Sequence, residues 1–253
     1  MDFKVNGVKL GVQSYAIREY NTIETACEAM KELGLDTLEL CSVQCNFDDK
    51  EACEHVLDVC AKNGITISTI GVEGFTARDP EKAIARFEFA KAAGCKYIGC
   101  DPDSDPDTVA MIEGLCDKFG IKVMMHNHGI HHRYGNYEQI DELLSKYSKN
   151  LGLHVDCAWA LDAGIDPVEL IKKYSDRVHG IHLKDFKMNP DGAHEEMILG
   201  EGSLNLKDLM LTVETLPEFG VMSIEYEAPN PVENLKKCVR NVVGQVTVNN
   251  LLR

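Results

Sequence analysis

Short apolar runs alternate with longer amphipathic segments along the chain, and each pair occupies roughly 26–31 residues, the length of one strand–helix unit. Short apolar runs are typical of buried strands, and longer amphipathic segments are typical of helices that pack on a sheet. Eight strands are predicted, at Lys9–Gln13, Thr37–Leu40, Ile65–Ile70, Tyr97–Cys100, Lys122–His126, Leu151–Asp156, His179–Lys184 and Val221–Glu225. The helices predicted to follow them are Thr22–Leu33, Lys50–Lys62, Pro80–Ala93, Pro106–Phe119, Tyr137–Tyr147, Pro167–Tyr174, Leu206–Leu216 and Pro231–Val242.

Residues that start and stop helices stand where this alternation requires them. An aspartate followed by proline is typical of a helix start, because the carboxylate caps free N–H groups and proline suits the first turn. This pair begins three of the predicted helices, at Asp79, Asp105 and Asp166. A glycine in the left-handed conformation commonly ends a helix. The first four predicted helices are followed by Gly34, Gly64, Gly94 and Gly120.

Eight strand–helix units in 253 residues predict an α/β fold, a (β/α)8 TIM barrel, as a single domain over residues 1–253. A doubly wound open sheet is the alternative. That fold usually carries a glycine-rich phosphate-binding turn after its first strand, and the segment GVQSYAIRE has none. One connection is long, from Phe186 to Asn205. A connection of this length is typical of a functional lid or rim, and a floppy insertion is the alternative.

Ionisable residues occupy the polar phase of several predicted strands near their carboxyl ends. Glu39 stands between two leucines, and the same alternation with apolar neighbours recurs at Asp156, His182 and Glu225. In a barrel, alternate residues point into the lumen, and catalytic groups come from the carboxyl ends of the strands. A hydrogen-bonded core residue is the alternative for any one of these positions. Their recurrence on separate strands favours a shared site at the barrel mouth.

A cluster of buried carboxylates requires a cation, because without one their pKa values rise at a cost of several kcal/mol. Asp156, His182 and Glu225, with one ligand from the fifth strand, therefore predict a site for one divalent metal ion. Oxygen ligands mixed with imidazole suit Mn²⁺, Mg²⁺, Co²⁺ or Zn²⁺ better than a metal that prefers thiolates. We take Mn²⁺ as the first expectation.

Further candidate residues surround this predicted metal site. The segment HNHGIHH after the fifth strand holds four of the nine histidines and is expected to touch a ligand, with a solvated run as the alternative. The indole of Trp159 is suited to stacking on a sugar face, although such a residue is as often a packing residue. The expected substrate contacts are Glu39, Trp159, Lys184, Asp185, His131 and Glu201, the last in the long connection.

Composition narrows the class of partner. The net charge of −15 repels a phosphate backbone, so nucleic acid is not expected as a partner. The chain has no signal-peptide pattern, no long apolar stretch and no C-x-x-C pair among its ten cysteines. We therefore expect a soluble cytoplasmic protein with reduced thiols and no membrane partner.

Seven segments together resemble the xylose isomerase-like TIM-barrel family, also called sugar phosphate isomerase/epimerases. They are GVQSYAIRE, LDTLEL, AGCKYIGCDPD, KVMMHNHG, LHVDCAWALDAGIDPVELIKKYSDRVHGIHLKDF, LGEGSLN and SIEYE. The resemblance runs nearly end to end, and the ordered series D-x-x-W, H-x-K-D, G-E-G and S-I-E is fairly specific. It implies one divalent metal held at Glu, Asp, His and Glu positions. Asp156, His182 and Glu225 match the last three, and His126 stands where many epimerases have glutamate.

The resemblance implies a sugar or keto-sugar substrate and proton abstraction next to its carbonyl, through an enediolate. Glu225 is the expected base, and His126 or His128 the partner acid. The expected activity is isomerase or epimerase. Because H-x-H also resembles inosose dehydratase-like and keto-glycoside lyase members, a lyase is the alternative, and a non-catalytic sugar-binding barrel is the third. His131 or His132 could then supply part of what the missing glutamate does.

The same superfamily includes metal-dependent apurinic endonucleases, which have further metal-binding histidines. Trp159 and Lys187 stand at two of those histidine positions, so a nuclease is not expected. The sequence leaves the oligomeric state open, with a homo-oligomer as one alternative.

Overall fold

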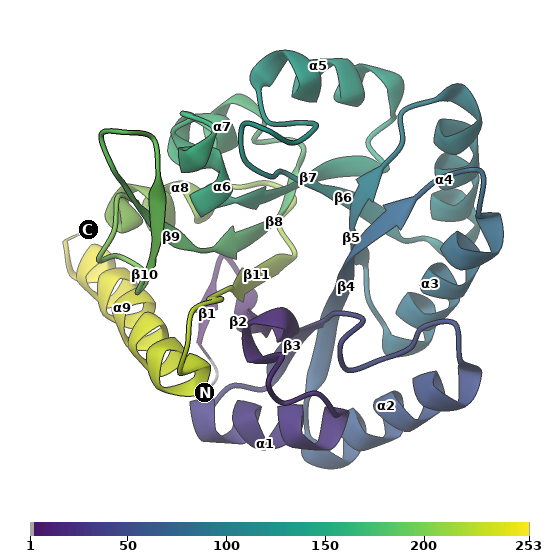
Figure 1. The fold of residues 1–253 in the computed structure, drawn as a ribbon, viewed down its shortest axis with the longest axis horizontal. Helices are drawn as coiled ribbons and strands as arrows, with labels where there is room; N and C mark the ends of the chain where they lie inside the picture. The colour runs from purple at the N-terminus through teal and green to yellow at the C-terminus, as the bar shows by residue number, and fades with distance from the viewer. Residues whose placement is uncertain (1–2, 253) are drawn as a thin grey trace.

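A closed barrel of parallel strands surrounded by helices forms the body of the molecule (Figure 1). This computed structural model describes residues 3–252, so residues 1, 2 and 253 of the predicted domain lie outside the described part. Within residues 3–252 the barrel strands are β2 (Val8–Gln13), β3 (Thr37–Leu40), β4 (Thr66–Phe75), β5 (Tyr97–Pro102), β6 (Lys122–His126), β7 (Leu151–Asp156), β8 (Val178–Leu183) and β11 (Val221–Ile224). They pair in this order, and β11 pairs with β2 to close the ring. The predicted TIM barrel is confirmed.

The outer helices begin and end close to the predicted positions. They are α1 (Ile23–Leu33), α2 (Lys50–Asn63), α3 (Pro80–Ala93), α4 (Pro106–Phe119), α5 (Tyr137–Lys146), α7 (Pro167–Lys173), α8 (Leu206–Val213) and α9 (Pro231–Leu251). Asp79, Asp105 and Asp166 cap the helices that follow them. The glycines that end α1 to α4 have φ values of 67° to 78°, the left-handed conformation that the sequence predicts.

The structure adds short elements to the predicted pattern. β1 (Lys4–Val5) pairs antiparallel with β2, and the short 3-10 helix η1 (Ser14–Ile17) follows β2 directly. α6 (Cys157–Asp162) begins where β7 ends. The last helix is longer than predicted, since α9 continues past Val242 to Leu251.

The long connection after β8 is a β-hairpin rather than the predicted loop. β9 (Asp185–Met188) pairs antiparallel with β10 (His194–Met197), with Met188 opposite His194. The turn between the two strands closes through Asn189, whose N–H donates to the carbonyl of Ala193 at 2.8 Å. In Figure 1 the hairpin stands beside the barrel mouth, next to α6. We name it the β9–β10 hairpin.

The barrel wall separates an apolar layer, between the strands and the helices, from a polar lumen. Apolar side chains such as Leu38, Val155 and Ile181 are fully buried between the strands and the helices. The lumen holds polar side chains, among them His154, which has no exposed surface. Gly180 makes room for this ring, because a Cβ there would lie 2.8 Å from His154 Cδ2.

All ten cysteines are free thiols, as predicted, and most are buried. No helix within residues 3–252 is long and apolar enough to cross a membrane.

Candidate metal centre

Four side chains predicted to bind metal converge at the barrel mouth. His126 ends β6, Asp156 ends β7, His182 lies near the end of β8, and Glu225 directly follows β11. One ligand atom from each lies within 4.8 Å of the others. We name these four residues the metal cluster.

The spacing of the donor atoms fits a small divalent ion. His126 Nε2 lies 3.0 Å from His182 Nδ1 and 3.6 Å from Asp156 Oδ2. His182 Nδ1 lies 3.7 Å from Asp156 Oδ2 and 3.1 Å from Glu225 Oε2. Ligand atoms arranged tetrahedrally around an ion at about 2.0–2.1 Å are separated by about 3.3 Å. The observed distances lie on both sides of that value, so the cluster needs little rearrangement to bind a metal.

The two carboxylate oxygens of Asp156 have different surroundings. Oδ1 accepts the backbone N–H of Trp159 at 2.8 Å and so caps α6. Oδ2 is buried without a hydrogen-bond partner among the described residues. The side-chain amide of Asn127 exchanges two hydrogen bonds with the Asp156 backbone and fixes its position. Burial would raise the pKa of Asp156, but His126 and His182 hold it well below its usual range.

Glu39 lies on the other side of the His182 ring. Its Oε1 is 3.0 Å from His182 Nε2 and accepts a hydrogen bond from Gln13 Nε2 at 3.2 Å. Burial opposes its ionisation, yet the charges of His182 and His154 lower its pKa to about 2. The sequence predicted Glu39 as a substrate contact. The structure places it beneath a metal-cluster histidine, and it is fully buried.

His154 is a lumen residue that the sequence analysis did not single out. It precedes Asp156 by two residues on β7 and therefore shares its phase, which is the signal that was available. Neither ring nitrogen has a hydrogen-bond partner among the described residues, and its Nε2 lies 3.8 Å from Glu39 Oε2. Glu39, His154 and His182 form a second group of potential ligands below the metal cluster.

A cavity of about 350 Å³ opens beside the metal cluster. Its lining includes three predicted residues besides His126, namely His128, Trp159 and Glu225. Burial, and then the neighbouring His126 and His132, lower the pKa of His128 to about 4. The cavity is within the size range of small-molecule pockets, about 300–1,000 Å³.

Lys184 and Asp185 follow the metal cluster on the chain but face different surroundings. Lys184 Nζ forms an ion pair with Glu227 and lies 3.7 Å from Glu225 Oε2, next to the cavity lining. Asp185 accepts backbone N–H groups from Gly200, Gly202 and Leu204 at 2.9–3.0 Å. Its carboxylate therefore holds the segment after the β9–β10 hairpin, and the structure does not bring it to the cavity.

His131 and Glu201 are the other predicted contacts that lie away from the cavity lining. Both are exposed, and neither lines the cavity. Glu196 of β10, which the sequence analysis missed, lies closer: its Oε1 accepts the N–H of Glu227 at 2.9 Å. Burial raises the pKa of Glu196 to about 7.

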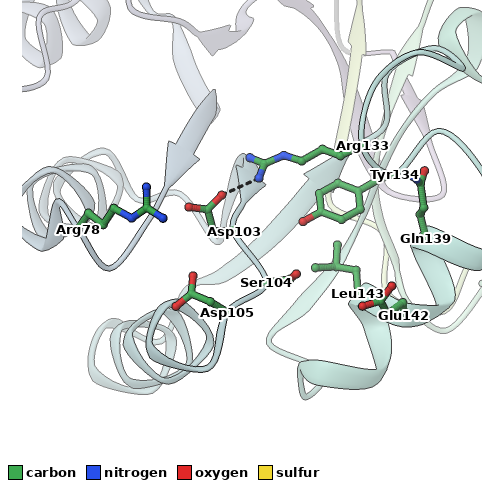
Figure 2. Close-up of a pocket in the computed structure, with 9 residues that line it drawn as sticks. All are labelled: Arg78, Asp103, Ser104, Asp105, Arg133, Tyr134, Gln139, Glu142 and Leu143. Carbon is green, nitrogen blue, oxygen red and sulfur yellow. Dashed lines mark hydrogen bonds and ion pairs between the residues drawn. The ribbon is translucent and has the colours of Figure 1, made fainter.

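Figure 2 shows a larger cavity of about 500 Å³, between the segments that follow β5 and β6. Several of its charged groups already have partners: Arg133 bonds to Asp103 at 2.6 Å, and Asp105 caps α4. None of the predicted site residues lines it. The cavity beside the metal cluster is therefore the better candidate for a reaction site.

The chain belongs to the family described as xylose isomerase-like TIM barrel, whose model matches residues 27–241. A curated relative is the inosose dehydratase of Geobacillus kaustophilus (strain HTA426), which is 34% identical over 95 residues. That match covers 33% of this chain and 29% of the relative, so it spans less than a third of the relative's length.

Solved structures share the fold at low identity. The IOLI protein with a binding zinc atom has a TM-score of 0.75 and 17% identity, over 96% of this chain and 99% of that protein. A D-tagatose 3-epimerase-like protein has a TM-score of 0.72 and 17% identity, over 97% of this chain and all of that protein. At this identity they support the fold.

Proposed function

We propose that this chain is a metal-dependent sugar isomerase or epimerase that removes a proton next to a carbonyl and passes through an enediolate. The observation that carries the proposal is the convergence of His126, Asp156, His182 and Glu225 within 4.8 Å beside a ligand-sized cavity. Family membership adds support, because known relatives include an inosose dehydratase and epimerase-like proteins.

The four residues of the metal cluster would hold one divalent ion. Such an ion supplies Lewis-acid polarisation of a carbonyl oxygen. Mn²⁺ is our first choice for a site of oxygen and imidazole ligands, with Mg²⁺, Co²⁺ and Zn²⁺ as alternatives. Zinc gains support from the zinc atom named for the IOLI protein.

Glu225 is positioned to act as the base. It lines the cavity, and Lys184 and His182 on its two sides stabilise its ionised form. His128 lines the same cavity, with its ring centroid 4.6 Å from that of His126. His128 or His126 would return a proton to the carbon skeleton. Trp159, which has an edge against Phe186, presents an apolar surface to the substrate.

A lyase is the second candidate, and His126 favours it. Exchange of protons on two faces of a ketose by two metal-bound carboxylates needs a second glutamate, and the cluster has an imidazole at that place. A base and an acid of different chemical type instead suit removal of a proton followed by expulsion of a leaving group. The inosose dehydratase among the relatives is consistent with this chemistry.

Metal analysis combined with solvent exchange tests the proposal. We expect the purified protein to bind one ion per chain and to incorporate deuterium from D₂O next to the carbonyl of a ketose. Loss of water or of an aglycone during exchange would identify the lyase. Metal binding without exchange on any ketose or keto-sugar would support a non-catalytic sugar-binding barrel, and absence of metal would contradict the proposal.

A further inference from the structure

Exposed apolar side chains gather at the barrel mouth. Tyr15, Val43 and Ile130 have exposed fractions of 40%, 36% and 57%, and each lies in a segment that follows the carboxyl end of a barrel strand. The other large apolar side chains exposed within residues 3–252 are at the end of α9, namely Val248, Leu251 and Leu252. An exposed apolar patch that adjoins a cavity is typical of a binding surface.

Two of these side chains belong to the cavity beside the metal cluster. Tyr15 and Val43 line it together with Val72 and Trp159, and we name these four residues the apolar rim. The deep end is polar, since His126 is 3% exposed and Glu225 lies next to it in the metal cluster. The cavity thus offers both polar and apolar side chains to a single ligand.

The cavity lining offers no basic side chain to a phosphate group. This lining, which falls within the described residues 3–252, includes Glu225 and Glu227 but no lysine or arginine. The nearby Lys184 is paired with Glu227. Arg18 donates to the carbonyl oxygens of Tyr15 and Glu227 at 3.1 and 2.6 Å and so holds the rim together. A phosphate group bound at the apolar rim would meet the carboxylate of Glu227 and no basic side chain of the lining.

We infer that the substrate is an unphosphorylated sugar derivative with an apolar, ring-sized substituent, which binds on the apolar rim while the sugar faces the metal cluster. This inference rests on the proposed function for the orientation of the sugar. It adds the chemical class of the substrate, which the metal cluster alone does not define. A cavity of about 350 Å³ has room for a ligand with two such parts.

Fluorescence of the single tryptophan, Trp159, reports occupancy because its ring lines the cavity. The metal-loaded protein is titrated with phenyl β-D-glucoside, methyl β-D-glucoside and glucose 6-phosphate. We expect the phenyl glucoside to bind about ten-fold or more tightly than the methyl glucoside, because it buries an additional apolar ring. Equal affinities, tighter binding of the phosphate, or no binding of the phenyl glucoside would overturn the inference.

Two matched valine variants locate the effect. Val43→Ser should reduce the preference for the phenyl glucoside by about three-fold or more and leave the methyl glucoside unaffected. Val248→Ser changes an exposed valine on α9, away from the cavity, and should change neither affinity. Circular dichroism verifies that both variants are folded. An unchanged preference in Val43→Ser would remove Val43 from the binding surface and contradict the inference.

The outcomes separate this inference from the proposed function. Deuterium exchange on free ketoses with no preference for the phenyl glucoside would overturn the apolar-substituent inference alone. A clear preference for the phenyl glucoside in a protein that binds no metal would overturn the proposed function and leave the apolar rim as a binding surface.

Discussion

His182 occupies a central position in the lumen, because its two ring nitrogens face different partners. Nδ1 faces the metal cluster, 3.1 Å from Glu225 Oε2, and Nε2 lies 3.0 Å from Glu39 Oε1. A histidine with one ring nitrogen against a carboxylate is oriented by that charge, and its other nitrogen is free to bind a metal. The Glu39 carboxylate thereby acts on the site through His182 rather than through the substrate.

Replacement of His182 tests the metal cluster at its centre. His182→Ala should lose metal binding while the barrel stays folded, because the change leaves in place the buried apolar residues Ile181 and Leu183 beside it on β8. Elemental analysis of the purified variant measures this. The exposed His55, which pairs with Glu24 on the outer surface, provides the control, and His55→Ala should retain the metal. Full metal content in His182→Ala would exclude His182 as a ligand.

Glu39→Gln tests whether the carboxylate beneath His182 positions this histidine for metal binding. The amide keeps the volume of the side chain but removes the charge that orients His182, so the metal dissociation constant should rise about 10–100-fold. Competition with a metal-binding dye measures it. Glu54→Gln, on the exposed face of α2, should leave the constant unchanged. An unaltered affinity in Glu39→Gln would mean that Glu39 has no positioning role.

At the scale of elements, the β9–β10 hairpin connects the strand that carries His182 with the outer edge of the cavity. Phe186 stacks on His194 with ring centroids 4.1 Å apart, and the Trp159 ring packs edge-on against both. His194 Nδ1 also bonds to Asp162 Oδ1 of α6 at 2.8 Å. The hairpin is therefore packed on α6, and Glu196 lies where the hairpin reaches the segment after β11.

Glu196 gives this element a pH dependence. Burial raises the pKa of Glu196 to about 7. The charge of Lys184 lowers this pKa, whereas the charges of Glu227 and Glu225 raise it. The folded chain thus binds this proton more tightly than the unfolded chain, whose glutamate has a pKa near 4.5. Stability from this group is complete below about pH 4.5 and is lost as the pH rises to about 7.

The corresponding variant is Glu196→Gln, which keeps an oxygen to accept the Glu227 N–H. It should slow hydrogen exchange in residues 185–197 at pH 8. The free energy of local opening should rise by an amount on the order of 1–2 kcal/mol, after allowance for solvent screening. Exchange rates corrected for intrinsic pH effects provide the measurement. Glu195→Gln, the exposed neighbour, should not change them. Equal protection in Glu196→Gln and the unmodified chain at pH 8 would contradict the assignment.

The sequence predicted the barrel units well, because helix signals such as the Asp79 cap and the Gly94 end are local. It placed His126, Asp156, His182 and Glu225 on the correct phase, since strand alternation is also local. The β9–β10 hairpin was missed because its pairing depends on packing against Trp159 and α6. The positions of Asp185 and Glu201 were missed because closeness to the end of β8 in sequence does not define which way side chains of the hairpin and of the segment after it point.

At the scale of the whole molecule, the metal cluster joins strands that are distant in sequence. β6, β7, β8 and the residue directly after β11 each contribute one of the four side chains, and β11 also pairs with β2 to close the barrel. An ion that binds all four would stabilise the closed ring against opening, because the unfolded chain does not hold these residues together.

Removal of the metal should therefore lower the melting temperature. An ion at about 100 times its dissociation constant stabilises the folded chain by about 2.7 kcal/mol. For a chain of this size that corresponds to a shift of roughly 5–10 °C. Thermal unfolding before and after chelation, with restoration by added Mn²⁺, provides the measurement. His182→Ala should be insensitive to the chelator, and a chelator-insensitive unmodified chain would argue against a shared ion.

Asp185 has a consequence for how a ligand gains entry. By accepting three backbone N–H groups between residues 200 and 204, it fastens the far end of the β9–β10 hairpin to the barrel wall. Hydrogen bonds therefore hold this side of the mouth in place, from Asp185 to residues 200–204 and from His194 to Asp162 of α6. The accessible members of the cavity lining are on another sector, at η1 and after β3, where Tyr15 and Val43 stand in solvent. A ligand that enters the cavity from this sector would therefore meet these two side chains first.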